Sequence, residues 1–365
     1  MKLAPEATAG RYGTRKLRTS KFARRLLDEW RRLELPQTNP CVVVATSGGA
    51  DSMALLHGVV ELAEVDRLSV EVIIAHLDHG LRGEQGRQDA RWVAAQAAAL
   101  RCRAEIGFAD VRGRASAAGD NLEQAARRAR YEFLRAAAEK HRAHYVLTGH
   151  TMSDQAETML MRLLRGGGTE GLGGIRPLRR LEASSPESST DVQLARPLLG
   201  WAQRTDTENY CRAQGVEFRN DAMNEDEDFA RVRVRRKLIP LMETFNPRVV
   251  ETLARTAGIL REDADALREE ATKLINLACA ASEGKEEESW LRVAPLAEAS
   301  RALRRNALRQ WLRCERGDLR RLESVHIAAI ERLLNDGRGG RVVELPGGGR
   351  VERLGGVLRF FRQGS

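Results

Sequence analysis

The chain has 365 residues, which is longer than one typical domain and predicts two or three domains that each bury a core. Hydrophobic residues make up 42% and charged residues 30%, as in soluble globular proteins, and no segment reaches the roughly 18 consecutive apolar residues of a membrane span. Lysine and arginine number 60 against 51 acidic residues, a net charge of +9, which favours an RNA or DNA partner without establishing one. We expect no membrane partner.

The cysteines are widely scattered, with no C-x-x-C pair and no histidine at metal-ligand spacing: Cys41, Cys102, Cys211, Cys279 and Cys314. This pattern predicts reduced, mostly buried thiols in a cytoplasmic protein.

Residues 1–38 form the first predicted segment, a basic tail followed by a helix. Their arginine content superficially resembles an organelle transit peptide, but no secretory h-region is present. Apolar residues in 20–33 recur at helical spacing, and we expect this helix to dock on the rest of the protein.

Strands and helices are predicted to alternate from residue 39 onward. Apolar runs at 41–46, 70–76, 104–108 and 145–149 predict strands, and helical patterns lie at 52–64, 84–100 and 121–141. This alternation predicts an α/β fold with a parallel sheet, whose ligands bind at the carboxyl ends of the strands. A polar stretch at 182–191 is expected to be an exposed loop within this domain, which spans 39–245.

The first predicted strand runs into a glycine turn and then a helix. The turn reads Ser47, Gly48, Gly49, Ala50, Asp51, Ser52. Glycines let backbone N–H groups converge on an anion, and the helix N-terminus adds partial positive charge. Asp51 is a poor phosphate ligand but a good Mg²⁺ ligand, so the turn predicts a nucleotide with its metal. An ordinary Gly-Gly turn capped by Asp51 is the alternative.

The second strand ends in the segment HLDHGLR, residues 76–82. We predict that His76 and His79 contact the adenosine or polyphosphate of ATP. A core histidine and a turn-forming Asp78 are the alternative.

The helix at 121–141 is expected to begin at Asn121 or Asp120, and it carries Arg127 and Arg130 three residues apart on one face. These two arginines are predicted to bind phosphate, with a solvated arginine-rich surface as the alternative.

A further helix follows Gly149 and His150 at the fourth strand end. Asp154 and Glu157 lie one helical step apart, so both carboxylates can face the cleft and bind a cationic substrate such as the ammonium group of lysine. We assign His150 to the same lysine site, with helix capping as the alternative for the acids. Arg165 is a predicted RNA or phosphate contact, and the glycines at 166–168 predict either a hinge or a helix stop.

An acidic run at 220–228 precedes Arg231, Arg233 and Arg235. These arginines cannot all share one helical face, so some are expected to reach phosphate or RNA and others the acids. A surface ion-pair network is the alternative.

The last predicted domain spans 246–365. It shows a helical pattern at 246–277, a charged linker at 282–288, helices at 302–312 and 325–334, and strands at 341–345, 350–354 and 357–361 joined by glycine turns. This pattern predicts a helical and small α+β region.

In chain order, the segments SGGADS, HLDHGLR, NLEQAARRARY, GHTMSDQAETMLMRLLRGGG, RPLL and NDAMNEDEDFARVRVR resemble the signature segments of bacterial tRNA(Ile)-lysidine synthetases. That family belongs to the PP-loop ATP pyrophosphatase superfamily, and the chain has no Walker-type G-x-x-x-x-G-K-[ST]. The resemblance covers about residues 40–245, and the LPGGGRV turn resembles the family's C-terminal tRNA-binding domain. It implies a PP-loop domain, adenine nucleotide alpha hydrolase-like, followed by a tRNA-binding region.

The resemblance implies an ATP-dependent ligase. ATP adenylates the C2 carbonyl of the wobble cytidine in a CAU-anticodon tRNA(Ile), and the ε-amine of L-lysine displaces AMP to give lysidine, AMP and pyrophosphate. The implied roles are ATP binding by residues 47–52, Mg²⁺ binding by Asp51, lysine binding by Asp154 and Glu157, and contact with the activated cytidine or phosphate by Arg130.

The chain departs from its relatives at two positions. Ser153 stands where many relatives carry an additional aspartate, and Val232 stands where they often carry asparagine. The alternatives are a PP-loop tRNA sulfur-inserting enzyme, a GMP-synthetase-like amidotransferase, and a non-catalytic nucleotide-sensing RNA-binding protein. The sequence leaves open the general base, the exclusion of tRNA(Met), the role of the basic tail, and oligomeric state, with a homodimer as one option.

Overall fold

The computed structural model describes residues 19–182, 191–219, 227–280, 290–317, 319, 321–335 and 341–362. The basic tail, most of the predicted loop at 182–191, the acids at 220–226 and the linker at 282–288 lie outside the described residues. The chain forms two compact units, which we describe separately. The first comprises residues 1–167 and 174–257, and the second comprises 168–173 and 258–365. The predicted domain limits at residues 38 and 245 stay predictions.

A six-stranded sheet in the order β3-β2-β1-β4-β6-β5 organises the first unit. Its strands are β1 Thr38–Ala45, β2 Ser69–Asp78, β3 Arg103–Phe108, β4 Tyr145–Thr148, β5 Leu178–Arg180 and β6 Gln193–Ala195. All neighbouring pairs are parallel except β5 with β6. The predicted parallel sheet and its first four strands are confirmed, whereas β5 and β6 are only three residues long and leave no pattern in the sequence.

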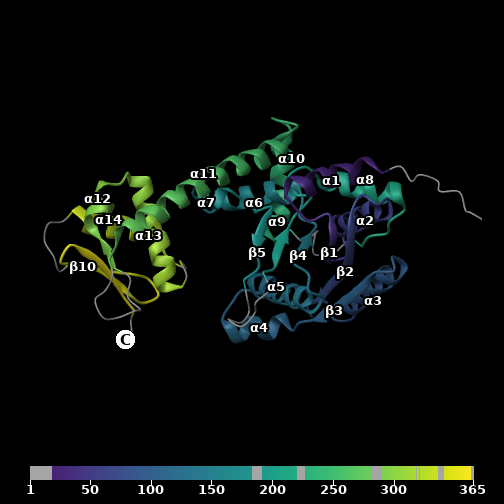
Figure 1. Cartoon of the computed structure of the whole chain (residues 1–365), viewed down its shortest axis with the longest axis horizontal. Helices are drawn as coiled ribbons and strands as arrows, with labels where there is room; N and C mark the ends of the chain where they lie inside the picture. Colours follow the sequence, from purple (N-terminus) through teal and green to yellow (C-terminus); the bar gives the residue numbers. More distant parts are fainter. Residues whose placement is uncertain are drawn as a thin grey trace, which may run out of the picture. The chain divides into compact units, whose positions relative to one another are not determined.

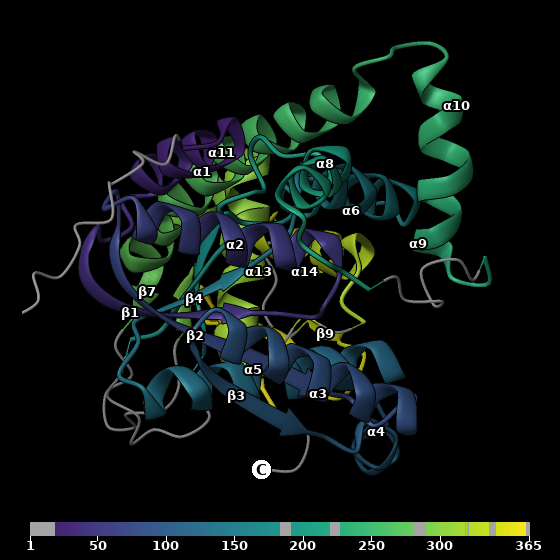
Figure 2. The same ribbon diagram turned by 90° about the vertical axis from the view of Figure 1, so that its right-hand side faces the viewer.

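Helices cover both faces of this sheet (Figures 1 and 2). They are α1 Lys21–Arg32, α2 Ala50–Glu64, α3 Glu84–Ala99, α4 Val111–Ala118, α5 Leu122–Lys140, α6 Met152–Leu164, α8 Arg204–Gln214, α9 Ala230–Arg233, the π-helix Val234–Leu238 and α10 Ile239–Glu243. One core joins α1, α2, α3 and α8 to one face of the sheet, and a second core packs α5 against the other face. The right-handed crossovers of parallel strands produce this layering.

The predicted docking of the N-terminal helix is confirmed. Leu26 and Trp30 of α1 are completely buried. Glu61 of α2 accepts hydrogen bonds from the Ser20 N–H at 2.5 Å and from the Tyr210 hydroxyl at 2.9 Å. One carboxylate therefore joins α2 to the start of α1 and to α8.

The chain reverses its direction of travel across the sheet between β1 and β4. From β1 it moves outward through β2 to β3, and it then returns to place β4 on the other side of β1. In open parallel sheets such a switch point leaves a crevice at the carboxyl ends of the strands, which is where ligands bind.

Gly149, which follows β4, allows the two sides of this crevice to approach closely. A Cβ atom here would lie 2.7 Å from the Asp51 carbonyl oxygen and 2.9 Å from the Ser52 nitrogen. Both contacts are with backbone atoms, so a side chain could be accommodated only by moving the glycine turn.

We therefore expect Gly149→Ala to lower ATP affinity at least about tenfold and to cost about 1–3 kcal/mol of stability through overpacking. Calorimetric titration with ATP and chemical unfolding would measure the two effects. Gly171→Ala is the matched control, because an added Cβ there meets nothing within 4 Å. Unchanged ATP affinity in Gly149→Ala would show that the turn tolerates the shift.

The second unit contains a five-stranded sheet in the order β7-β8-β11-β10-β9. Its strands are β7 Cys279–Ala280, β8 Trp290–Arg292, β9 Val342–Glu344, β10 Arg350–Leu354 and β11 Val357–Phe361, and its helices are α7 Thr169–Leu172, α12 Val293–Glu298, α13 Arg301–Arg316 and α14 Ser324–Asn335. The long helix α11, Val249–Ala278, begins in the first unit and continues into the second. The predicted helical and small α+β region is confirmed.

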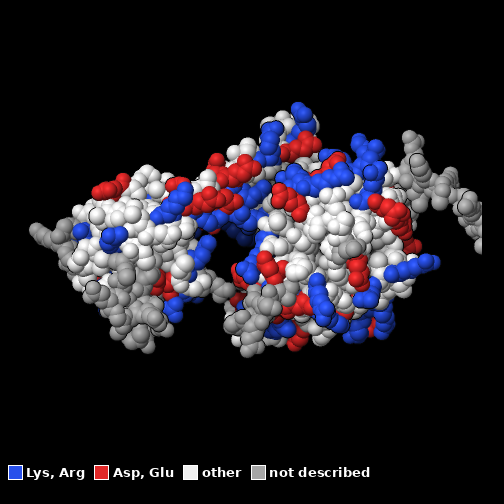
Figure 3. All heavy atoms as spheres, viewed as in Figure 1, with Lys and Arg blue, Asp and Glu red and all other residues white. Residues whose placement is uncertain are grey.

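On the face drawn in Figure 3, basic and acidic side chains alternate over the described part of the first unit. The net charge of the chain therefore does not mark a binding site on this face. None of the helices in the described parts of the chain is both long and apolar enough to cross a membrane.

Candidate active site

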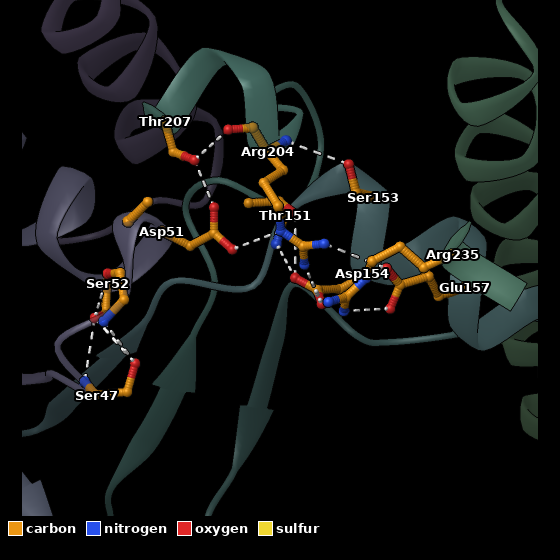
Figure 4. A network of polar contacts seen from close by, with 12 residues as sticks. Ser47, Asp51, Ser52, Thr151, Ser153, Asp154, Glu157, Arg204, Thr207 and Arg235 are labelled. Atoms are coloured by element: carbon orange, nitrogen blue, oxygen red, sulfur yellow. Dashed lines mark hydrogen bonds and ion pairs between the residues drawn. The ribbon is translucent and has the colours of Figure 1, made fainter. Parts of the chain in front are cut away.

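The predicted glycine turn lies between β1 and α2, at the carboxyl edge of the sheet (Figure 4). Gly48 has a φ of 90°, a conformation that favours glycine, and Gly49 caps α2. The Ser52 hydroxyl accepts a hydrogen bond from the Ser47 N–H at 3.1 Å and lies 3.2 Å from the Ser47 hydroxyl. The turn thus presents two hydroxyls and a helix N-terminus, which together suit a phosphate group.

Asp51 points from the first turn of α2 toward α8 (Figure 4). Its Oδ1 accepts a hydrogen bond of 2.5 Å from the Thr207 hydroxyl, and its Oδ2 lies 3.6 Å from Nε of Arg204. Burial raises the pKa of Asp51 to about 6, against the opposing effects of Arg204 and Thr207. A cation beside this carboxylate would favour its ionised form.

Asp154 and Glu157 lie on α6, across from Asp51. Asp154 accepts a hydrogen bond from the Thr151 N–H at 2.8 Å, so the helix-capping alternative also holds for this residue. The Glu157 side chain is completely buried and accepts hydrogen bonds from Nε of Arg231 at 2.7 Å and Nε of Arg235 at 2.6 Å. Arg231 also donates to Asp154 at 3.1 Å. A buried carboxylate requires such partners.

Arg204 lies between Asp51 of α2 and the two carboxylates of α6. The sequence analysis did not identify this arginine. Its guanidinium lies 3.6 Å from Asp51, 3.8 Å from Asp154 and 3.7 Å from Glu157. Its backbone N–H donates to the Ser153 hydroxyl at 3.2 Å, so Ser153 fixes the start of α8 to α6. Arg204 and Thr207 lie on a helix that the sequence analysis did not predict, and a capped amphipathic pattern from Gln203 was the one available signal.

A cavity of about 720 Å³ opens beside these groups. The cationic residues that line it are Arg82, Arg130, Arg204, Arg219, Arg231, Arg235 and Arg236, and the acidic ones are Asp51, Asp154 and Glu208. Seven guanidiniums exceed the three carboxylates of the lining even when Glu157 and Asp89, which pair with four of them from behind, are added, and this positive excess suits polyphosphate or RNA. Asp89 pairs with both Arg82 and Arg219, and the Arg219 N–H donates to the Gly48 carbonyl at 2.9 Å, so this pair also supports the glycine turn.

Three predicted histidines line the same cavity. His76 is buried and donates through Nδ1 to the Thr46 carbonyl at 2.8 Å. Burial lowers the pKa of His79 to about 4 and that of His150 to about 3, with nearby arginines adding to the effect. All three rings are therefore neutral near pH 7 and add no positive charge to the cavity.

His79 gives a testable dependence of stability on pH. The pKa of His79 in the folded state lies below the ordinary value of a histidine. The unfolding free energy is therefore unaffected by its titration above about pH 6.5 and decreases as the pH falls from there toward 4, because the unfolded chain binds the proton first. As the pH falls from about 7.5 to about 5, we expect the unfolding free energy of His79→Gln to rise relative to the parent by up to about 1 kcal/mol, a value reduced for solvent screening of this partly exposed ring. Urea unfolding at both pH values measures this difference, and a constant difference would contradict the assignment.

The remaining predicted residues lie outside the cavity lining. Arg165, Arg127 and Arg233 are exposed, and Glu157 lies behind Arg231 and Arg235. Arg231 and Arg235 point to one side while Arg233 does not, which confirms that these three arginines share no single face. The Gly167 N–H bonds to the Arg162 carbonyl at 2.8 Å, so the glycines at 166–168 end α6.

Comparisons with known proteins agree with this geometry. Residues 18–242 match the family model of the PP-loop domain, and residues 291–363 match that of the TilS substrate binding domain. A U34-tRNA thiolase from Methanococcus maripaludis superposes with a TM-score of 0.52, covering 66% of this chain and 79% of its own at 15% identity, and this likeness concerns the fold alone. The first unit is therefore a PP-loop domain.

Relatives of similar sequence identify the family more closely. A tRNA(Ile)-lysidine synthase from Salinispora tropica is 37% identical, with 91% of this chain and 94% of the relative covered. The corresponding enzymes of Geobacillus kaustophilus and Symbiobacterium thermophilum are 35% and 45% identical, covering 88% and 64% of this chain. The chain spans 67% and 46% of those two relatives. The chain belongs to the tRNA(Ile)-lysidine synthase family.

Proposed function

We propose that the chain is a carbon–nitrogen ligase that converts the wobble cytidine of a CAU-anticodon tRNA(Ile) to lysidine, with ATP and L-lysine as cosubstrates. The observation that carries this proposal is the convergence of the phosphate-binding turn and the carboxylates of α6 on one guanidinium. Arg204 lies within 3.8 Å of both Asp51 and Asp154. A nucleotide on the turn and an amine on α6 would therefore lie close together, as attack on an adenylated base requires.

Asp51 is the residue proposed to hold Mg²⁺. In the described part of the chain no group of three or more His, Cys, Asp and Glu side chains is placed to hold a metal ion by itself. One carboxylate beside a phosphate-binding turn fits Mg²⁺, which proteins commonly bind through one or two carboxylates and the phosphates of the substrate. When bound, the ion would neutralise charge that develops on the phosphates.

Lysine binding is proposed to require an exchange of cations. Glu157 and Asp154 already bind arginines, so an incoming ammonium group must replace at least one guanidinium. Arg231 and Arg235 also line the cavity, where phosphates of ATP or RNA offer them another anion. Bound phosphate would thus free a carboxylate for lysine, and the two affinities would be coupled reciprocally.

Arg130 is proposed to contact the activated cytidine or its phosphate. It lines the cavity and forms no ion pair with any described residue. The chain acts on tRNA under this proposal, so we place it in the cytoplasm, and a homodimer stays a prediction.

Mass spectrometry of a CAU-anticodon tRNA(Ile) transcript, incubated with ATP and isotopically labelled lysine, tests the proposal. We expect a mass gain that carries the lysine label, together with release of AMP and pyrophosphate. A reaction without lysine is the control, and a tRNA(Met) transcript tests selectivity. Absence of the labelled product, or a gain of sulfur instead, would reject the proposal.

The sulfur-inserting alternative is not favoured. The cysteines lie on separate elements, with Cys41 on β1, Cys211 on α8 and Cys314 on α13, and none is in a disulfide. Family membership also favours lysidine formation over this alternative.

A further inference from the structure

A second group of arginines surrounds Tyr131 on α5, outside the cavity lining. The Cζ atom of Arg179 lies 4.4 Å from the centre of the Tyr131 ring, and that of Arg127 lies 5.2 Å from it. The charge of Arg196 also acts on Tyr131. We call Arg127, Tyr131, Arg179 and Arg196 the Tyr131 cluster.

Arg196 is unusual because it is a buried cation with donor capacity left over. It is 1% exposed, and its guanidinium donates to the Arg176 carbonyl at 2.5 Å. Its Nε has no hydrogen-bond partner among the described residues, and neither has the buried Nε of Arg179. Burial, together with the charges of Arg179 and Arg127, lowers the pKa of Arg196 to about 10. Buried donors of this kind normally have partners.

Among the described residues, the Tyr131 cluster has no carboxylates of the kind that balance the arginines near Asp51. Its three arginines form no ion pair with any residue in the described ranges. Burial would raise the pKa of Tyr131, but the surrounding arginines together lower it below its ordinary value. Guanidiniums held together without counter-charges repel one another, and an anion would remove this repulsion.

The Tyr131 cluster adjoins the arginines that line the cavity. Arg130 precedes Tyr131 on α5 and lines the cavity, and its charge acts on Tyr131. A polyanion that extends out of the cavity past Arg130 would therefore meet Arg127 and Arg179. A single nucleotide on the glycine turn would not need to extend that far.

We propose that Arg127 and Arg179 of the Tyr131 cluster bind a backbone phosphodiester of the RNA strand, next to the nucleotide whose base enters the cavity, while the buried Arg196 adds its charge without touching the RNA. This inference rests on the proposed function and adds a positioning site to it. Two guanidiniums lie beside one tyrosine ring, with Cζ atoms 4.4 and 5.2 Å from its centre, so several N–H donors are close together, as the oxygens of a phosphate require. Phosphate contacts of this kind set the register of a strand without reading its bases.

The test measures binding of a stem-loop RNA with a CAU anticodon loop to the full chain over a range of salt concentrations. We expect Arg127→Gln and Arg179→Gln each to weaken RNA binding about three- to tenfold. Each should also reduce the slope of log affinity against log salt by about 0.7, the value for one contact to single-stranded RNA. Affinity for ATP should not change in either variant.

Arg67→Gln is the matched control. Arg67 is an exposed arginine between α2 and the amino end of β2, and its substitution should alter neither affinity nor slope. Arg179→Lys separates charge from packing, because a lysine keeps the charge but not the guanidinium beside the ring. It should retain the parent's salt slope.

Unchanged RNA affinity in both glutamine variants would overturn the proposal, as would a loss confined to ATP binding. A salt slope that falls equally in Arg179→Lys and Arg179→Gln would also overturn it, because packing would then be the cause. Lysidine formation by the parent is measured in parallel. If the parent makes none but its RNA binding depends on Arg127 and Arg179, the proposed reaction fails while this RNA site stands.

Discussion

Replacing Asp51 by alanine is expected to abolish pyrophosphate release, with a loss of at least about a thousandfold. Asp51 is the carboxylate nearest the glycine turn, and its removal leaves Mg²⁺ with only phosphates and hydroxyls as ligands. A pyrophosphate assay with ATP, lysine and tRNA measures the effect. Glu84→Ala is the control, because Glu84 is also an acid in the first turn of a helix but is not in the cavity lining.

The Asp51 variant also separates metal binding from nucleotide binding. The backbone N–H groups and hydroxyls of residues 47–52 remain, so ATP without Mg²⁺ should bind with nearly the parent's affinity. Retained pyrophosphate release in Asp51→Ala would refute the metal role, whatever the affinity for ATP.

Asp154→Asn is expected to raise the lysine concentration needed for half-maximal rate by about ten- to a hundredfold. Asparagine can still accept the hydrogen bond from the Thr151 N–H that Asp154 accepts, so the start of α6 should remain intact. It cannot supply the negative charge that an ammonium group requires. Steady-state kinetics with lysine varied at saturating ATP and tRNA measure this change.

Asp206→Asn is the control for this experiment. Asp206 accepts a hydrogen bond of 2.8 Å from the Gln203 N–H at the start of α8, the same capping role, and it does not line the cavity. The two variants thus differ in position but not in chemistry. A normal lysine requirement in Asp154→Asn would remove the lysine assignment.

The parts of the site that could be predicted from the sequence are local in the chain. The glycine turn follows an apolar run and precedes a helix within about a dozen residues, so β1, the turn and α2 were all predictable. Asn121 caps α5 as expected, through a hydrogen bond of 2.8 Å from the Gln124 N–H. Such features depend on backbone geometry and neighbouring side chains, which a sequence displays directly.

The missed residues depend on contacts between distant segments. Thr207 and Asp51 are 156 positions apart, and Arg219 and Asp89 are 130 apart. Neither pairing leaves a periodic or motif signal. The carboxylates were expected to face an open cleft, whereas Glu157 is buried beneath arginines of a short helix and a π-helix that the sequence did not indicate. Predicting such pairings requires the tertiary fold.

Glu61 connects the two helices that carry the proposed active site. It lies near the far end of α2, the helix that starts at the phosphate-binding turn, and it also holds Tyr210 of the helix that supplies Arg204 and Thr207. The hydrogen bond between Glu61 and Tyr210 therefore holds α2 and α8 together at a point distant from the proposed active site. We expect a change at Glu61 to shift the glycine turn relative to Arg204 and Thr207, so that turnover falls before the protein loses its fold.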